Sequence, residues 1–109
     1  AEGCKLLVYP GAFNTVTGPV HWELLQRGRA LDNQVFVATA SPARNPESKY
    51  QAWGHSSVID PWGRVLATTE HDSAVVVTEI DLDYTEEVRV SVPISHQKRL
   101  DLYNSVSLK

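Results

Sequence analysis

The chain has 109 residues, of which 42% are hydrophobic and 21% charged, with a formal net charge of −3. This composition is typical of a globular domain, and the acidic balance argues against a nucleic-acid or anionic-membrane surface, because both need a basic face. A single cysteine forms no internal disulfide, and the wide Cys/His spacing predicts neither a metal site nor a cofactor. With neither a signal peptide nor a membrane-spanning run, we expect a cytoplasmic protein and leave a mitochondrial location open.

The first half of the chain predicts a strand, a helix and a second strand. Residues 5–9 form a short apolar run of the buried-strand type, which stops at Pro10 and Gly11. Between residues 21 and 33 the apolar positions recur at helical spacing. Residues 34–40 form the second buried strand. Two strands that flank a helix in this way are expected to run parallel.

The second half predicts antiparallel strands and a short helix. The expected elements are a hairpin of 54–60 with 64–68, a strongly β-branched strand at 74–80 and a helix at 81–92. The fold class is therefore α/β, with one domain over 1–109: about 1–92 supply its layers, and 93–109 form an irregular tail at a subunit interface. A sheet of these strands alone leaves edges and one apolar face uncovered, so we expect a partner.

Several motifs resemble the nitrilase superfamily of carbon–nitrogen hydrolases, in order and over essentially all 109 residues. They are VYPGAF at 8–13, HWELL at 21–25, RGRALDNQVFV at 27–37, GHSSVIDPWG at 54–63 and KRLDLY at 98–103. The resemblance implies an α-β-β-α sandwich, of which this chain would be the C-terminal portion, and catalysis by a glutamate, a lysine and a cysteine. None of the three motifs that carry those residues is present, so the nucleophile is expected upstream of this chain and we assign no catalytic residue within it.

Within the superfamily, residues 9–14 and 38–43 are most similar to omega-amidases. That similarity implies hydrolysis of the amide of alpha-ketoglutaramate or alpha-ketosuccinamate, through a cysteine thioester, to acid and ammonia. Related amidases, carbamoylases and nitrilases stay open as alternatives. Implied partners are a small-molecule amide substrate and either a second copy, giving a homodimer, or the missing N-terminal part. The competing hypothesis is a non-catalytic, truncated interaction module that associates with full-length subunits.

Candidate substrate-binding residues follow the two parallel strands, because sites in open α/β sheets collect at the carboxyl ends of strands. Phe13 is expected to line an acyl pocket, and Thr17 to bind a carboxylate or carbonyl oxygen. The alternative roles are packing for Phe13 and stabilisation of the loop for Thr17. The complete set of candidates is Gly11, Ala12, Phe13, Thr17, Thr39, Ala40 and Ser41.

Three other groups suggest chemistry but favour structural roles. Cys4 precedes the first strand, and five residues at ~3.3 Å put the carboxyl end about 16 Å away from it. His21 and Glu23 lie two positions apart at a helix start, so their side chains diverge. Within His55-Ser56-Ser57, adjacent strand residues face opposite ways, which excludes a hydrolase triad built from them.

Overall fold

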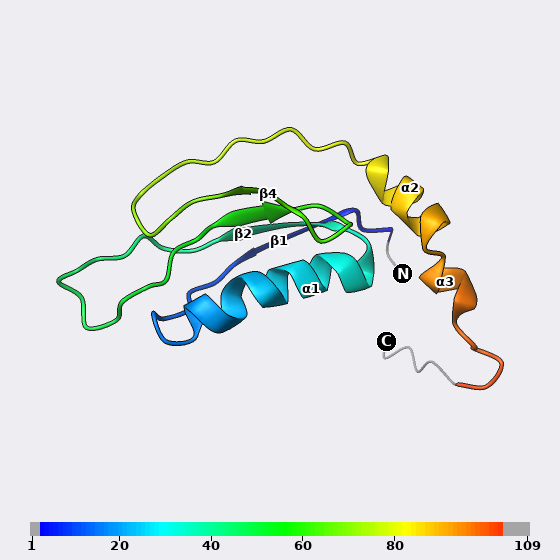
Figure 1. Ribbon diagram of the computed structural model, residues 1–109, viewed down its shortest axis with the longest axis horizontal. Coiled ribbons are helices and arrows are strands. Elements are labelled where there is room, and N and C mark those ends of the chain that lie inside the picture. Colours follow the sequence, from blue (N-terminus) through cyan, green and yellow to red (C-terminus); the bar gives the residue numbers. More distant parts are fainter. Residues whose placement is uncertain (1–2, 104–109) are drawn as a thin grey trace.

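The computed structural model describes residues 3–103. The chain forms a four-stranded mixed sheet with one long helix on one face (Figure 1). Its strands are β1 (Leu6–Pro10), β2 (Phe36–Ala40), β3 (Ser57–Ile59) and β4 (Val65–Thr68). Its helical segments are the π-helix η1 (Gly18–Trp22) and the α-helices α1 (Glu23–Asn33), α2 (Tyr84–Ser91) and α3 (Ile94–Gln97).

The sheet has the order β1-β2-β3-β4, which follows the chain. Strands β1 and β2 pair in parallel, with Leu6 opposite Phe36 and Pro10 opposite Ala40. The pairs β2–β3 and β3–β4 are antiparallel, with an irregularity between Val58 and Ile59. The prediction of one parallel pair followed by antiparallel strands is confirmed.

The core lies between α1 and the sheet face that it covers. Ala30 of α1 packs with Val35, Val37 and Ile59, all fully buried or nearly so. Partly buried Leu7, Tyr9 and Val65 complete this layer. Because side chains alternate along a strand, Leu7 and Tyr9 share the α1 side of β1, whereas Val8 lies on the opposite face with 68% of its surface exposed.

The end of α1 uses an uncommon residue. Gln34 has φ 53°, in the left-handed region, and its backbone N–H donates to the carbonyl groups of Ala30 and Leu31. Glycine usually occupies this position, because a side chain is strained there. The Gln34 side chain also donates, through Nε2, to the carbonyl of Val92 at 2.7 Å. This bond ties the helix end to the segment that follows α2.

The predicted hairpin forms, and its turn is stabilised by Asp60. One oxygen of this carboxylate accepts hydrogen bonds from the backbone N–H groups of Trp62 and Arg64, each at 2.9 Å. Gly63 has φ 83°, a conformation that side chains disfavour. Arg27 of α1 donates from Nε to the Gly63 carbonyl at 2.7 Å. The hairpin is therefore joined to the helix as well as to β2.

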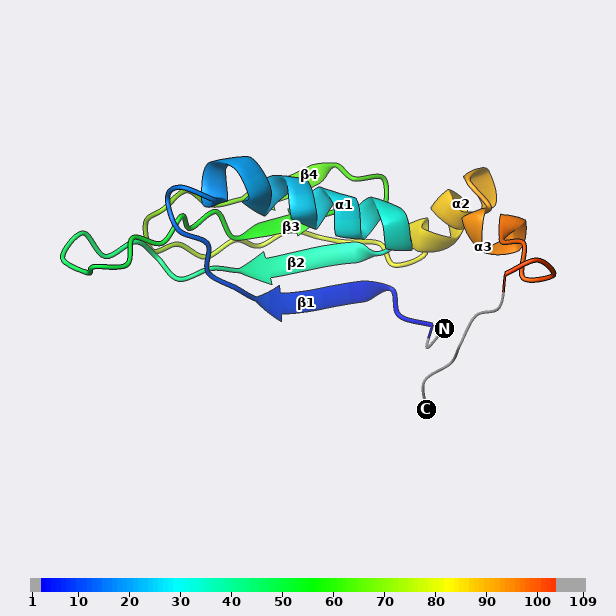
Figure 2. The same ribbon diagram turned by 90° about the horizontal axis from the view of Figure 1, so that it is seen from below.

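The strand predicted at 74–80 is wrong, since these residues form no ladder within the described part of the chain. Figures 1 and 2 show the segment running along the sheet face opposite α1. Its period of two is preserved: Val76, Thr78 and Ile80 are partly buried, whereas Val75 and Val77 are each 90% exposed. The residues suit a strand, but none of the four described strands pairs with them.

Other boundaries also differ from those predicted. The strand expected at 54–60 is shortened to β3, because Gly54 (φ 80°) and His55 (φ 62°) break its start. The helix expected at 81–92 is α2, and it ends before Pro93 as predicted. The tail, expected to be irregular, contains the four-residue helix α3, and residues 104–109 lie outside the described part. The described residues therefore form one mixed sheet with one long covering helix, an α/β arrangement as predicted.

Candidate functional site

The carboxyl ends of β1 and β2 meet at one edge of the sheet, as the parallel pairing requires (Figure 2). The backbone N–H of Gly11 donates to the carbonyl of Ala40 at 2.9 Å, directly beyond the last pair of the ladder. This bond places Gly11 beside Ala40, and Ala12, Phe13 and Ser41 follow these two residues along the chain. Five of the seven candidate residues are therefore close together at this edge.

The first edge loop, residues 11–17, is organised around Asn14. Its side-chain oxygen accepts hydrogen bonds from the backbone N–H groups of Val16 (3.0 Å) and Thr17 (2.9 Å). The same oxygen accepts a bond from the Thr17 hydroxyl at 3.0 Å. The Thr17 hydroxyl thus already donates within the loop, and a substrate oxygen would have to compete with Asn14 for its proton.

Replacing Asn14 by alanine is expected to lower the free energy of unfolding by about 1–2 kcal/mol, because two backbone N–H groups lose their acceptor. Asn14→Asp keeps an acceptor oxygen and serves as the matched control, with a smaller loss. Urea unfolding of the three proteins measures the effect. Equal midpoints for the alanine variant and the parent would contradict the role assigned to Asn14.

A second edge loop, residues 41–56, crosses the first one. The Trp53 backbone N–H donates to the Phe13 carbonyl at 2.7 Å, and the Tyr50 hydroxyl donates to the Ala12 carbonyl at 3.0 Å. Asn14 and Ala52 form an isolated antiparallel bridge between the two loops. The signal in the sequence that residues 41–56 pack against a neighbour is their two aromatic residues, Tyr50 and Trp53.

Trp22, the last residue of η1, lies beneath the first edge loop and is 1% exposed. Its ring meets that of Phe13 edge-on, with centroids 5.2 Å apart and an interplanar angle of 67°. The indole Nε1 donates to the His55 carbonyl at 2.6 Å. Gly11 passes so close that a Cβ there would lie 3.3 Å from the Trp22 ring. Trp22 thus supports both edge loops at once.

Thr39 differs from the other candidates because it is buried on the α1 side of β2, with 6% of its surface exposed. Its hydroxyl lies 3.5 Å from the Ser57 carbonyl. Tyr9 lies beside it in register. Burial raises the pKa of Tyr9 and the charge of Arg29 partly offsets this, so the phenol stays protonated near neutral pH.

The groups that sequence analysis assigned to structural roles have structural contacts. Glu23 pairs with Arg27 at 3.5 Å on the surface of α1. His55 Nδ1 lies 2.8 Å from the Trp53 carbonyl, and the Ser56 hydroxyl accepts a bond from the Ser41 backbone N–H at 2.9 Å. The Ser57 hydroxyl donates to the His55 carbonyl at 2.7 Å. None of these contacts joins a hydroxyl to a histidine ring nitrogen, as a triad requires.

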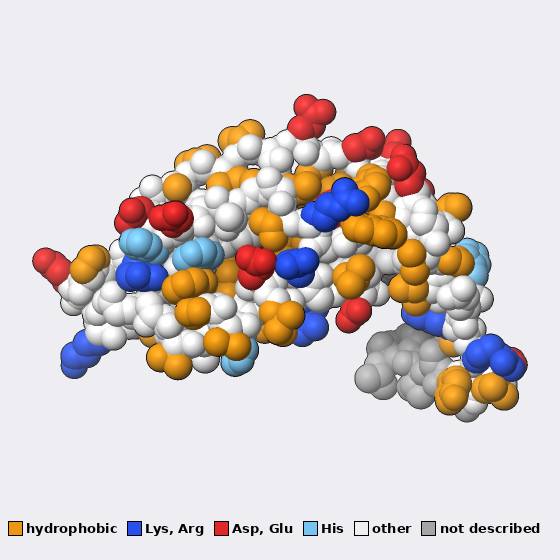
Figure 3. Space-filling model, viewed as in Figure 1, with side chains coloured by type: hydrophobic (Ala, Val, Ile, Leu, Met, Phe, Trp, Pro, Cys, Tyr) orange, Lys and Arg blue, Asp and Glu red, His pale blue; other side chains and the backbone are white. Residues whose placement is uncertain are grey.

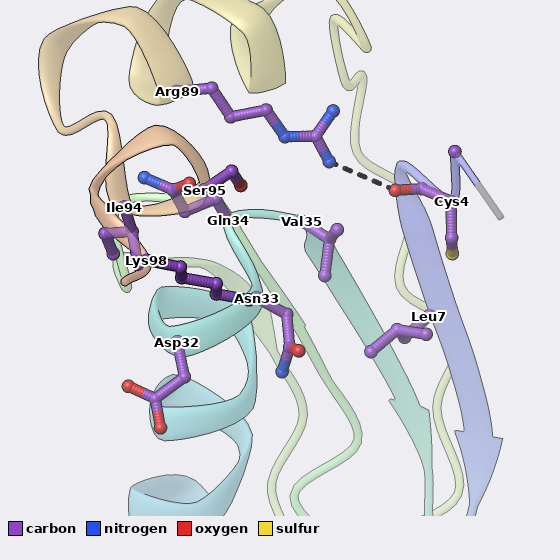
Figure 4. A pocket seen from close by; sticks show the side chains of 11 residues that line it. Cys4, Leu7, Asp32, Asn33, Gln34, Val35, Arg89, Ile94, Ser95 and Lys98 are labelled. Carbon is purple, nitrogen blue, oxygen red and sulfur yellow. Dashed lines mark hydrogen bonds between the residues drawn. The ribbon is translucent and has the colours of Figure 1, made fainter. Parts of the chain in front are cut away.

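Cys4 lies at the other end of the molecule, before the amino end of β1. A pocket of about 410 Å³ there is lined by Cys4, Leu7, Asp32, Arg89 and Lys98, among others (Figure 4). The guanidinium of Arg89 donates to the Cys4 carbonyl at 3.2 Å, and the thiol itself donates to the Leu6 carbonyl at 3.1 Å. The thiol thus donates to the backbone, at the opposite end of β1 from the candidate substrate-binding residues.

Among residues 3–103, no group of three or more His, Cys, Asp or Glu side chains is placed to hold a metal ion. Over the same residues, no helix has both the length and the apolar composition that a membrane crossing needs. In the tail, Arg99 and Asp101 form an exposed ion pair, and the bond from Arg99 lowers the pKa of Asp101.

Comparison with known proteins finds a match to the carbon-nitrogen hydrolase family over residues 1–90. The omega-amidase NIT2 of Danio rerio is 60% identical over 108 residues, which are 99% of this chain and 39% of that protein. The crystal structure of Saccharomyces cerevisiae Nit3, a member of branch 10 of the nitrilase superfamily, has a TM-score of 0.84 and 48% identity, covering 89% of this chain and 36% of that one. The C. elegans NitFhit protein has a TM-score of 0.86 and 40% identity, covering 98% and 27%.

The extent of these matches corrects one prediction. The chain was expected to be the C-terminal portion of the family's fold, matched over essentially its whole length. The family match instead occupies residues 1–90, the N-terminal portion of the chain, and stops before the tail. The curated relatives are covered over only 33–39% of their length. The prediction of a C-terminal portion is therefore wrong, and the chain matches only part of the length of its relatives.

The partial match is nevertheless specific, because the four-stranded sheet with its covering helix superimposes on part of nitrilase-fold proteins. Identity near 60% extends over both edge loops and makes the chain a homologue of omega-amidases. This chain belongs to the carbon–nitrogen hydrolase family.

Proposed function

We propose that this chain is part of an omega-amidase-like enzyme that hydrolyses the amide of small dicarboxylic acid monoamides, such as alpha-ketoglutaramate and alpha-ketosuccinamate, to the acid and ammonia. The observation that carries the proposal is the 60% identity to an omega-amidase over 99% of the chain. Because the chain spans about two-fifths of that relative, the activity is assigned to the larger protein or assembly in which it works.

In the proposed reaction, a cysteine thiolate outside this chain attacks the amide carbonyl carbon. The carbon–nitrogen bond breaks, the nitrogen takes up a proton and leaves as ammonia, and a thioester remains. Water deprotonated by a glutamate, also outside this chain, then hydrolyses the thioester and restores the thiol. The position of Cys4 before the amino end of β1 supports a nucleophile elsewhere, since the substrate-binding candidates lie at the carboxyl edge.

The part proposed for this chain is one wall of the acyl pocket. Gly11, Ala12 and Ala40 are small, so they leave room at the sheet edge for a short acyl chain. Phe13 supplies an apolar surface supported from below by Trp22. Thr17 and Thr39 would act by shaping the wall, because the first already donates to Asn14 and the second is buried under α1.

A second copy of the chain is the partner we propose for the outer face of α1. Leu24 and Leu31 are 67% and 51% exposed there, and Val20 of the preceding η1 is 64% exposed. Figure 3 shows hydrophobic side chains gathered over this helix, with acidic and basic groups between them. Since Glu23 and Arg27 lie among them, two antiparallel copies of α1 would bring each carboxylate near the other copy's guanidinium.

The test is an assay of ammonia release by the natural protein that carries this chain, alongside the 109-residue chain alone. We expect turnover of alpha-ketoglutaramate and alpha-ketosuccinamate by the natural protein, at least about tenfold slower turnover of a simple aliphatic amide without a carboxylate, and none by the chain alone. Equal rates for all amides would refute the assigned substrate class. Absence of turnover would refute an amidase.

The competing function, a non-catalytic interaction module, is favoured by one observation. Val75 and Val77 are 90% exposed on a segment with strand-like alternation. In addition, β1 is an outer strand of the sheet, and its Val8 is exposed. Such surfaces pair readily with an added strand. Capture of a full-length subunit by the chain, together with inactivity of the natural protein, would favour this function over the amidase.

A further inference from the structure

We propose that Trp53 is a positioning residue, which holds the first edge loop in the shape needed to form the pocket wall. The structural part of this proposal stands on contacts within the chain. Its consequence for substrate binding rests on the proposed function, in which residues 11–13 line the acyl pocket.

The Trp53 ring is itself fixed from more than one side. The imidazole of His55 stacks on it with centroids 4.1 Å apart and an interplanar angle of 7°. The Arg44 guanidinium carbon lies over the ring at 5.8 Å from its centroid. Arg44 also donates to the carbonyl groups of Ala52 (2.8 Å) and Trp53 (3.3 Å). Both ring and backbone at position 53 are therefore restrained.

This arrangement depends on an unfavourable backbone conformation. Gly54 and His55 both have positive φ, 80° and 62°, and this double left-handed turn folds His55 back onto Trp53. A non-glycine residue at positive φ costs on the order of 1–3 kcal/mol and persists only where the surrounding structure over-determines it. A Cβ at Gly54 would lie 2.6 Å from the Glu70 carbonyl oxygen, which excludes other residues there. The strain is thus concentrated where His55 is placed against Trp53.

Trp53 contacts the first edge loop at Phe13 and the residue that follows the loop, Gly18. Its backbone N–H donates to the Phe13 carbonyl at 2.7 Å. Its Cβ and ring carbons lie against Gly18, where an added Cβ would overlap them. Residues 14–17, which are organised by Asn14, span the interval between these two contacts. Trp53 thus holds the loop at Phe13 and at the point where the chain enters η1.

The polar groups of the stack are engaged in bracing rather than in chemistry. Arg44 and His55 direct hydrogen-bonding groups to backbone carbonyls of the second edge loop itself. Trp53 fixes the position of the first edge loop. Such positioning has large effects, because a displacement of 1 Å at a binding site costs up to about 100-fold in rate. We call the contacts of Trp53 with Phe13 and Gly18 the brace. Loss of the brace would increase the conformational freedom of residues 11–17 and weaken substrate binding.

The experiment compares Trp53→Leu and the conservative Trp53→Phe in the natural protein, with Tyr84→Leu at the start of α2 as a matched aromatic control. Hydrogen exchange of peptides covering residues 11–18 reports the brace, and steady-state kinetics on alpha-ketoglutaramate report its consequence. For Trp53→Leu we expect about tenfold faster exchange in those peptides and about tenfold higher KM, with kcat changed less than about threefold. Trp53→Phe should restore most of both, and Tyr84→Leu should change neither.

Unchanged exchange in Trp53→Leu would overturn the brace. Faster exchange with an unchanged KM would overturn its part in substrate binding. If the parent protein hydrolyses no monoamide, the proposed function fails. Hydrogen exchange of the peptides covering residues 11–18 then tests by itself whether Trp53 restrains the loop. If Trp53→Leu does not fold, His55→Asn replaces it, because asparagine tolerates the left-handed backbone but removes the stacked ring. Its loop peptides should exchange several times faster, and unchanged exchange would equally overturn the proposal.

Discussion

Replacing Gly18 by alanine is expected to lower the free energy of unfolding by about 3 kcal/mol, and the melting temperature by about 15 °C. An added Cβ would overlap the Cβ and ring base of Trp53, and no side-chain rotation can move a Cβ away. Either the first edge loop or the backbone at Trp53 must shift. Because Gly18 is buried at the start of η1, the shift also disturbs the packing of Trp22.

The matched control is Gly28→Ala, in the middle of α1. Nothing lies within 4 Å of a Cβ added at Gly28, and alanine is the better helix former by about 1 kcal/mol. The two substitutions add the same methyl group to glycines in consecutive helical segments, with opposite expected signs. Thermal and urea unfolding of both variants check this. A Gly18→Ala protein as stable as its parent would mean that Trp53 does not pack against residue 18.

Truncating Trp22 to alanine is expected to have a comparable or larger effect, about 3–5 kcal/mol. The substitution empties the space beneath both edge loops and leaves the His55 carbonyl with the Ser57 hydroxyl as its remaining donor. Trp22→Phe retains most of the apolar contact with Phe13 but lacks the indole N–H. We therefore expect an intermediate loss, of which about 0.5–1.5 kcal/mol reflects the lost hydrogen bond to the His55 carbonyl.

Trp62 gives the control for this second prediction. It is 43% exposed in the hairpin turn, so Trp62→Ala is expected to cost roughly 1 kcal/mol. Unfolding by denaturant, followed by circular dichroism because the substitution alters fluorescence, compares the variants directly. Similar losses for Trp22→Ala and Trp62→Ala would contradict the buried, loop-supporting position of Trp22.

Local patterns predicted the elements that stabilise one another within the chain. Apolar runs at residues 5–9 and 34–40 on either side of a helical stripe identified the parallel pair, and Asp60 to Gly63 identified the hairpin turn. The location of Gly11 and Ala40 at one edge then followed from geometry, since parallel strands end at the same side.

The strand expected at 74–80 shows the limit of such patterns. Its β-branched residues identify a segment that fits a pleated surface, but strand formation also needs a neighbour to accept and donate backbone hydrogen bonds. Val75 and Val77 point away from the sheet instead. The crossing of the two edge loops could not be predicted from the sequence either. Tyr50 and Ala12 are 38 residues apart, and no periodicity links them.

Two details of the candidate site had signals that could have been used. Thr39 lies two residues after Val37, and alternation along a strand puts both on the α1 side. Thr17 follows Asn14 by three residues, a spacing typical of an asparagine that accepts hydrogen bonds from the next turn. Both patterns predict structural contacts, which the hydrogen bonds of Thr39 and Thr17 bear out, whereas their proposed contact with substrate stays a prediction.

The central claim is that the chain supplies a pocket wall at the carboxyl edge and that its only cysteine does no chemistry. Ammonia release from alpha-ketoglutaramate by the natural protein with Cys4→Ser tests this claim most directly. We expect kcat/KM within about twofold of the parent's value. The Cys4 thiol lies about 16 Å from the carboxyl end of β1, by the rise per residue of a strand. A loss of 100-fold or more in a folded Cys4→Ser protein would contradict it.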